Sequence, residues 1–131
     1  MKVVKQLALF LENKPGALAA VCAALGENKI NIFAISVSDA VDHAVVRIVV
    51  DNPHKALHLL GEHGVLVVER DVLLVMGKNK PGELAKIART LADHKVNIEY
   101  AYSVTMPGAT QGALILRLDN LRKGMRILKG H

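Results

Sequence analysis

The chain is poor in cysteine and aromatic residues, with one cysteine, no tryptophan, two tyrosines and two phenylalanines among 131 residues. One cysteine excludes a disulfide within the chain, and Cys22 stands in an apolar helical stretch, which favours a buried structural thiol over a nucleophile. The core must therefore be built from Val, Ile, Leu and Ala. So few aromatic side chains also argue against RNA binding by base stacking.

Long hydrophobic runs and targeting signals are lacking as well. No apolar run approaches the roughly 18–20 residues of a membrane-spanning helix. The N-terminus has neither the apolar segment nor the cleavage site of a signal peptide. We therefore expect a cytoplasmic protein without a membrane partner, and a reduced single thiol fits that compartment.

The charge is positive but not concentrated. Hydrophobic residues make up 51% of the chain and charged residues 22%, which indicates a packed globular protein. The formal net charge of +5 would suit an acidic partner, yet the lysines and arginines are scattered. The densest basic stretch, Arg122, Lys123, Arg126 and Lys129, is interpreted as a solvated helix face, and no nucleic-acid partner is expected.

Catalytic signatures are missing from the sequence. There is no Cys-His or Ser-His constellation at a useful spacing and no glycine-rich phosphate loop. His54 and His58 have the i, i+4 spacing of a metal site, but no carboxylate or thiol completes it, so we interpret them as solvated helix histidines. We expect a protein that is not an enzyme and holds no metal or cofactor.

An internal repeat organises the chain. The segment NKPGALA at residues 13–19 recurs as NKPGELA at residues 79–85, so that Asn13 corresponds to Asn79. In the same register, Asn-Ile at residues 31–32 recurs at residues 97–98. This self-similarity predicts two copies of one supersecondary unit, as domains of residues 1–70 and 71–131.

A short insertion separates the later parts of the two copies. Asp51-Asn52 matches Asp119-Asn120. The distance along the chain between these matching residues is two residues longer than the distance between Asn13 and Asn79. The second copy therefore has an insertion near residues 106–112, and insertions are tolerated best in loops.

Hydrophobic periodicity predicts the order βαββαβ in each copy. In the first copy the expected elements are residues 3–11, 15–28, 30–37, 44–50, a helix from Pro53 and a strand over 65–68. In the second they are residues 72–76, 81–93, 96–104, 113–118 and a helix from about Leu121. We therefore predict an α+β protein of two ferredoxin-like units, each an antiparallel sheet with its helices on one face, the second lacking its last strand. Uncovered sheet edges favour pairing, and we expect a homodimer.

Two features stand out at the repeated positions: an Asn-Lys-Pro-Gly turn between strand and helix, and Asn-Ile at the start of the next strand. In these features the sequence resembles the ACT domain family of amino-acid-sensing regulatory modules. In that family a strand, an Asn-x-Pro-Gly-x-Leu turn, a helix and an Asn-Ile strand recur in this order. The resemblance covers nearly the whole chain as a tandem pair.

The chemistry of the turn suits a zwitterion. A helix N-terminus leaves backbone N–H groups free and carries partial positive charge, which favours a carboxylate near Gly16 or Gly82. Glycine allows close approach of a ligand to the backbone. An asparagine side chain offers an acceptor and two donors without adding a charge.

The resemblance also implies a set of ligand-binding residues. In ACT modules of the phosphoglycerate dehydrogenase type, the turn asparagine and the second-strand asparagine of the paired domain hold the effector together. Carried over, Asn13 faces Asn97 and Asn79 faces Asn31, with Ile32 and Ile98 lining the pockets. That type also has a histidine two residues before the turn asparagine; Leu11 and Gly77 stand there instead, which argues against serine or another ligand anchored by that histidine.

The two copies differ around these positions. Only the second has Glu83 in its turn, Tyr100 and Tyr102 in its second strand, and the longer loop. One site is therefore expected to have lost or changed its ligand preference. The tyrosine hydroxyls could contact a polar side chain, or the rings could pack across strands.

We interpret the chain as a non-catalytic sensor that binds a small amino-acid effector and acts on a partner, such as a regulated enzyme. Asparagine and Pro-Gly are also ordinary turn and cap residues. A ligand-free module that engages another protein through its sheet edges therefore stays an alternative.

Overall fold

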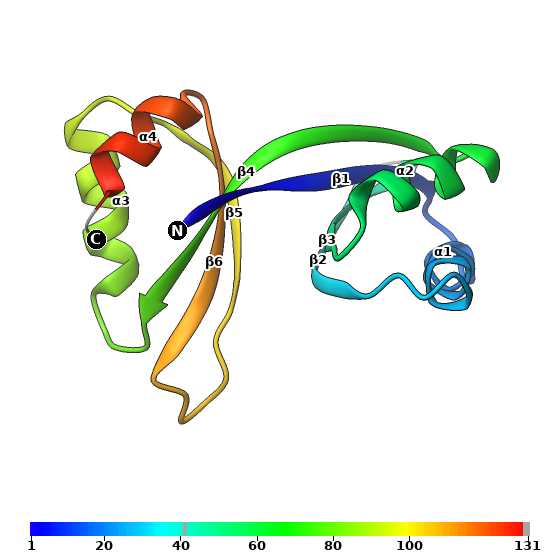
Figure 1. Cartoon of the computed structure of the whole chain (residues 1–131), viewed down its shortest axis with the longest axis horizontal. Helices are drawn as coiled ribbons and strands as arrows, with labels where there is room; N and C mark the ends of the chain where they lie inside the picture. Colours follow the sequence, from blue (N-terminus) through cyan, green and yellow to red (C-terminus); the bar gives the residue numbers. More distant parts are fainter. Residues whose placement is uncertain (41, 130–131) are drawn as a thin grey trace. The chain divides into compact units, whose positions relative to one another are not determined.

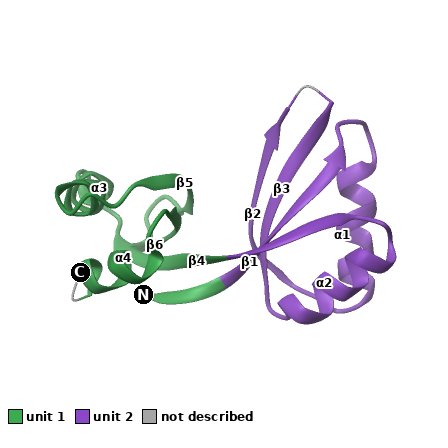
Figure 2. Ribbon diagram, turned by 90° about the horizontal axis from the view of Figure 1, so that it is seen from above, with its two compact units in different colours: residues 1–4, 71–131 green, residues 5–70 purple. Residues whose placement is uncertain are grey.

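The structure is a computed structural model that describes residues 1–40 and 42–129. The chain divides into two compact units (Figure 2): an N-terminal unit of Lys5–Arg70, and a C-terminal unit of Asp71–His131 together with Met1–Val4. Its elements are β1 (Lys2–Glu12), α1 (Ala17–Glu27), β2 (Ile32–Asp39), β3 (His43–Val50), α2 (Pro53–Glu62), β4 (Leu66–Lys78), α3 (Glu83–Asp93), β5 (Ile98–Val104), β6 (Gln111–Leu118) and α4 (Leu121–Leu128).

The N-terminal unit has the strand order β2-β3-β1-β4, with α1 and α2 on one face of the sheet (Figure 2). Strand β3 pairs antiparallel with both β1 and β2, and Leu9 stands opposite Val46. Alternate residues of these strands face the helices, as the period of two requires. The core consists of Leu7, Leu9, Leu11, Val21, Leu25, Ile30, Val46, Ile48, Val50, Ala56 and Leu60.

The C-terminal unit repeats this arrangement, and α3 and α4 cover one face of its sheet (Figure 1). Its own strands follow the order β4-β6-β5, and β1, whose first residues belong to this unit, is the neighbour of β4. No strand follows α4 among the described residues, so the ferredoxin-like pair with an incomplete second copy is confirmed. The core consists of Leu73, Val75, Ile87, Leu91, Val96, Leu114, Leu116, Leu118 and Leu128.

One predicted interruption is absent. Two strands were expected, over 65–68 and 72–76, with a break at Glu69-Arg70-Asp71, but β4 runs without a break from Leu66 to Lys78. The prediction was wrong because charged residues alone do not end a strand when no glycine or proline stands among them. The side chains of Glu69 and Arg70 lie exposed, and the Arg117 Nη1 group donates to the Asp71 carbonyl at 2.9 Å. The charged residues of this segment are therefore compatible with an extended backbone.

The thiol of the chain is less buried than predicted. Cys22 is only partly buried on α1. Val21 and Leu25, which stand at i, i+4, occupy the centre of the face that α1 turns to the sheet and are buried in its place. The prediction that Cys22 is buried was therefore wrong.

The helices α1 and α3 are each followed, two residues after their last residue, by a lysine in a left-handed conformation. Lys29 has φ 60° and Lys95 has φ 59°. The Ile30 N–H donates to the Leu25 carbonyl and the Val96 N–H to the Leu91 carbonyl, both at 2.9 Å, which closes each helix in the manner that usually employs glycine. A side chain at this position carries strain of roughly 1–2 kcal/mol.

Lys29→Gly and Lys95→Gly are therefore each expected to raise the free energy of unfolding by up to about 1 kcal/mol, because relief of strain exceeds the entropy that glycine loses on folding. Urea denaturation followed by circular dichroism measures the change. The matched control is Lys→Ala at each site, which keeps a Cβ and should give no gain. An equal gain from alanine would contradict the explanation.

Candidate functional site

The two repeated turns have nearly the same backbone. Gly16 and Gly82 precede α1 and α3 with φ of 89° and 88°, a conformation that strains any residue with a Cβ. Neither helix start is capped by a side chain. The first hydrogen bond of each helix ends on the turn glycine. The Gly16 carbonyl accepts from the Ala20 N–H at 2.9 Å, and the Gly82 carbonyl accepts from the Lys86 N–H at 3.0 Å. Both helix N-termini thus lack a side-chain cap, and they begin at Ala17 and Glu83, two residues after the predicted starts at Pro15 and Pro81.

The repeated strand starts are held by an aspartate. The Asn31 N–H donates to Asp51 Oδ1 at 3.1 Å, and the Asp51 N–H returns a bond to the Asn31 carbonyl at 3.1 Å. Asn97 and Asp119 form the same pair of bonds at 2.9 and 3.1 Å. The backbone is fixed by these bonds, and the side chains of Asn31 and Asn97 stay exposed.

A single unit does not bring its two asparagines together. Asn13 and Asn31 stand at opposite ends of α1, an 11-residue helix whose rise of 1.5 Å per residue separates them by about 16 Å. Asn79 and Asn97 flank α3, which also has 11 residues. The predicted pairing of a turn asparagine with a strand asparagine thus requires a second domain and stays a prediction.

The two isoleucines of the predicted site pack into the hydrophobic cores. Ile32 contacts the core of the N-terminal unit, and Ile98 that of the C-terminal unit. In the register Ile32 stands opposite Val50 and Ile98 opposite Leu118, which both face the helices. Their role in lining a ligand pocket stays a prediction.

A pocket of about 190 Å³ lies in the C-terminal unit, where β4 ends and α3 begins. It includes Asn79 of the predicted site, whereas Gly82, Asn97 and Ile98 do not line it. The lining residues are Gly77, Lys78, Asn79, Lys80, Glu83, Leu84, Ile87, Ser103, Thr105, Gly112, Ala113 and Leu114.

A pair of glycines makes room for this pocket. Gly77 of β4 and Gly112 of β6 stand opposite each other in the sheet, in line with Val75 and Leu114, which face the helices. A Cβ built on Gly112 would overlap the Thr105 hydroxyl, and one on Gly77 would lie 3.3 Å from Glu83 Cγ. Polar side chains from neighbouring segments thus lie over the two glycines.

The N-terminal unit has side chains at the matching positions. Leu11 and Ala44 form the corresponding cross-strand pair, and each is only 8% exposed. Leu11 belongs to the hydrophobic core of that unit, so an apolar side chain occupies the place that Gly77 leaves to Glu83 and the pocket. Sequence reasoning noted Leu11 and Gly77 only as replacements for a histidine. The alignment of the two copies, combined with the strand register, was the signal for the pocket.

The turns also differ in charge. In the N-terminal unit Lys14 Nζ lies 2.8 Å from Glu12 Oε2. The hydrogen bond, with the attraction between the charges, lowers the pKa of the Glu12 carboxyl and raises the pKa of Lys14. The matching residues of the C-terminal unit are Lys78 and Lys80, and neither has an ion pair among the described residues. In the part of the chain that the structure describes, the C-terminal turn thus offers two positive charges that are in no ion pair, beside a pocket.

The inserted loop orients Asn79. The Asn79 N–H donates to the Thr110 carbonyl at 3.0 Å, and its Nδ2 group donates to the Ala109 carbonyl at 2.7 Å. The bond to Ala109 uses one of the two Nδ2 hydrogens, and Oδ1 is the acceptor that can receive a ligand hydrogen bond. An ammonium group is a matching donor.

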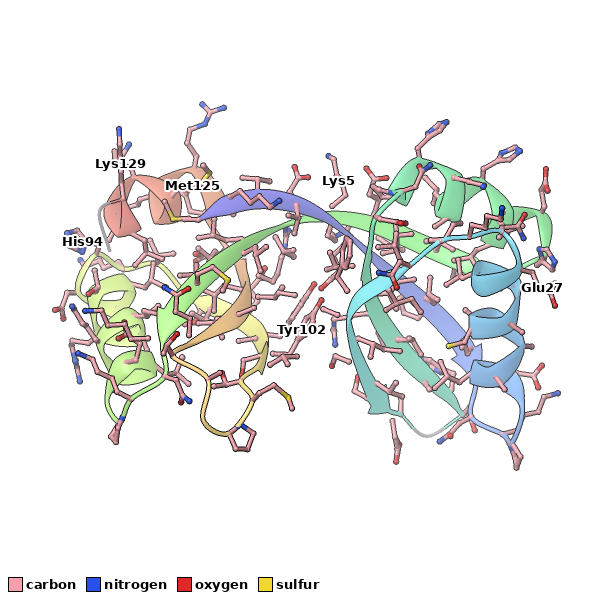
Figure 3. All side chains as sticks on the ribbon, turned by 60° about the horizontal axis from the view of Figure 1, so that its bottom comes forward. Lys5, Glu27, His94, Tyr102, Met125 and Lys129 are labelled. Atoms are coloured by element: carbon pink, nitrogen blue, oxygen red, sulfur yellow. The ribbon has the colours of Figure 1, made fainter. Side chains whose placement is uncertain are left out.

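Other residues singled out in the sequence lie away from this pocket. Tyr100 and Tyr102 stand opposite Arg117 and Ile115, on the sheet face turned away from the helices; Figure 3 shows Tyr102 on that side and His94 at the end of α3. The tyrosine hydroxyls therefore do not line the pocket. On α4, Arg122, Arg126 and Lys129 are exposed and Lys123 is partly buried.

The described residues include no group of three His, Cys, Asp or Glu side chains that could hold a metal ion. His58 Nε2 instead lies 2.9 Å from Glu62 Oε1, one helical turn away. No helix in the described part of the chain is long and apolar enough to cross a membrane.

Comparison with known proteins gives consistent matches. The family model described as ACT domain pair matches residues 1–129. A solved protein of Bacteroides thetaiotaomicron shares 34% identity with a TM-score of 0.92, over 98% of this chain and 88% of that one. The regulatory subunit of aspartate kinase from Thermus thermophilus, in its ligand-free form, shares 21% identity with a TM-score of 0.70, over 99% and 97% of the two chains. The corresponding subunit from Thermus flavus shares 22% identity with a TM-score of 0.66, over 99% and 96%. No curated protein matches the chain.

Proposed function

Because the chain belongs to the ACT domain pair family, we propose that it is a non-catalytic regulatory protein that binds a small amino acid at the turn of residues 78–82. Its functional domains would be residues 1–70 and 71–131. The observation that carries the proposal is the pocket of about 190 Å³ beside Asn79 and the uncapped start of α3.

The groups around this pocket complement an amino-acid zwitterion. The α-carboxylate would bind Lys78, Lys80 and the free N–H groups of the first turn of α3, where the helix dipole adds attraction. The α-ammonium would donate to Asn79 Oδ1, which the inserted loop leaves as an acceptor. Three separate elements thus hold one small ligand without an unpaired charge.

A paired domain would complete the site. Asn31 and Ile32 of a second copy would face Asn79 and Gly82, and the exposed side chain of Asn31 can make this contact. The repeat provides an equivalent arrangement of Asn13 and Gly16 with Asn97 and Ile98. We expect this second arrangement to bind the effector more weakly, because Leu11 is buried in the core and Lys14 is already paired with Glu12. A homodimer follows from this proposal.

The regulated partner would be an enzyme of the cytoplasm. The Thermus neighbours, which share this fold, are regulatory subunits of aspartate kinase. This chain aligns with those subunits over nearly the full length of both. Its sequence contains no catalytic constellation. Its effect would depend on binding another chain, whose affinity the effector would change by linkage.

A thermal-shift screen against the twenty amino acids tests the proposal. A ligand that binds only the folded state at 100 times its Kd adds about 2.7 kcal/mol of stability. We expect an upward shift with one or a few amino acids that is lost in Asn79→Ala and largely kept in Asn13→Ala, the matched control. Flat curves at millimolar concentrations would contradict effector binding.

A ligand-free interaction module is the second candidate, favoured by one observation. Phe33, Ile35 and Val37 are 63%, 44% and 52% exposed on β2, the outer strand of the N-terminal unit. Exposed apolar side chains on an edge strand are suited to pairing with another chain. Flat ligand curves combined with a stable complex formed through β2 would support this reading.

A further inference from the structure

We infer that the pocket of the C-terminal unit selects an amino acid whose short side chain carries a hydrogen-bond donor, and that the N-terminal unit has no counterpart of it. The selecting part, which we call the side-chain chamber, is formed by Gly77, Glu83, Ser103, Thr105 and Gly112. The inference rests on the proposed function, because it assumes that the α-amino and α-carboxyl groups bind at the turn beside Asn79.

The chamber has the size of a small side chain. The whole pocket, turn included, has a volume of about 190 Å³, so the α-amino and α-carboxyl groups share this space with the side chain. Thr105 and Glu83 lie over the Gly77–Gly112 pair at its floor, and Leu84 and Ile87 line it on the side of α3. A long or aromatic side chain would exceed this space.

The chemistry of the chamber favours a donor. An ionised Glu83 carboxylate only accepts hydrogen bonds, whereas the hydroxyls of Ser103 and Thr105 accept as well as donate. A hydroxyl, amide or ammonium group would donate to these acceptors. An aliphatic side chain would displace water from the two hydroxyls without replacing its hydrogen bonds, and a carboxylate would be repelled by Glu83.

The N-terminal unit has a different set of residues. The repeat, in which Asn13 corresponds to Asn79, places Ala17 at the position of Glu83 and Val37 at that of Ser103. The strand register matches Leu11 and Ala44 with the two glycines. Only the position of Thr105 keeps a polar residue, Asp39. The polar side chains of the chamber are thus replaced in this unit by mostly apolar ones.

Titration calorimetry on the full chain tests the inference with matched ligands. L-Threonine and L-valine have the same shape, but a hydroxyl in one replaces a methyl group in the other. L-Asparagine and L-2,3-diaminopropionate present an amide and an ammonium donor on a short side chain. We expect at least one donor-bearing ligand to bind about tenfold or more tightly than L-valine, with one strong site per chain.

Variants of the chamber identify the donor. Thr105→Val, which keeps the shape and removes the hydroxyl, should weaken a hydroxyl or amide ligand about tenfold and reduce its advantage over valine. Glu83→Gln should weaken an ammonium ligand more than the other ligands. Val37→Thr at the matching position of the N-terminal unit is the control and should leave the affinities unchanged.

Gly77→Leu introduces the residue that the N-terminal unit has at the matching position, Leu11, and should abolish strong binding. Gly77→Ala, whose Cβ would lie 3.3 Å from Glu83 Cγ, provides a milder step if the leucine variant does not fold. Equal affinities for valine and the donor-bearing ligands, or binding unaffected by Thr105→Val, Glu83→Gln and Gly77→Ala together, would overturn the inference but leave the proposed function standing. Absence of binding by every amino acid would overturn both.

Discussion

Gly124→Ala is expected to lower the free energy of unfolding by about 1–2 kcal/mol, although alanine is the better helix former by about 1 kcal/mol. Gly124 is buried on α4, and a Cβ built there would overlap Leu118 Cδ1 and lie 3.8 Å from Leu91 Cδ2. Leu118 and Leu91 are 1% and 0% exposed, so the neighbours have little room to move. Overpacking a dense core therefore outweighs the gain in helix propensity.

The repeat supplies a rescue for this variant. In the N-terminal unit Ala56 and Val50 occupy the positions of Gly124 and Leu118, and both are buried in its core. Leu118→Val should cost stability alone but recover much of the loss when it is combined with Gly124→Ala. Urea denaturation of the four proteins of this double-mutant cycle measures the coupling. Strictly additive losses would contradict the packing explanation.

Removing the two positive charges at the turn should weaken the effector strongly. Lys78→Gln combined with Lys80→Gln is expected to raise the Kd about 10- to 100-fold, because each hydrogen bond to a charged group contributes roughly 1.5–3 kcal/mol and part is kept by the start of α3. Titration calorimetry with the effector and with its carboxamide analogue separates the carboxylate contribution. The double variant should bind the two ligands almost equally.

Lys14→Gln is the matched control for this experiment. Lys14 already pairs with Glu12 at 2.8 Å, so its loss should change the effector affinity little. A Kd unchanged in the Lys78/Lys80 variant, or a larger loss in the control, would contradict the placement of the carboxylate.

The sequence predicted the fold well because local signals agreed with one another. Apolar periodicity, Pro15 and Pro81 in the turns, and the repeat each indicated the same order of elements, which the structure confirms. The error at β4 arose where the chain passes from one copy to the next. There the charged run resembled a turn, although the backbone had no residue that ends a strand.

The pocket was harder to predict than the turn. Asn79 and Gly82 belong to a contiguous motif, whereas Gly77, Ser103 and Gly112 meet only through the pairing of β4 with β6 and of β5 with β6. Register between distant strands is set by the packed sheet and not by local sequence. The contribution of Glu83 likewise depended on the missing side chain at Gly77.

The most direct test of the account is to follow the backbone amides by ¹H–¹⁵N correlation spectroscopy while the effector from the screen is titrated. The largest shift changes are expected at residues 78–84 and 103–114, with clearly smaller changes at residues 12–18 of the matching turn. Changes of equal or greater size at residues 12–18, or saturating binding that leaves residues 78–84 unperturbed, would contradict an effector site at the Asn79 turn.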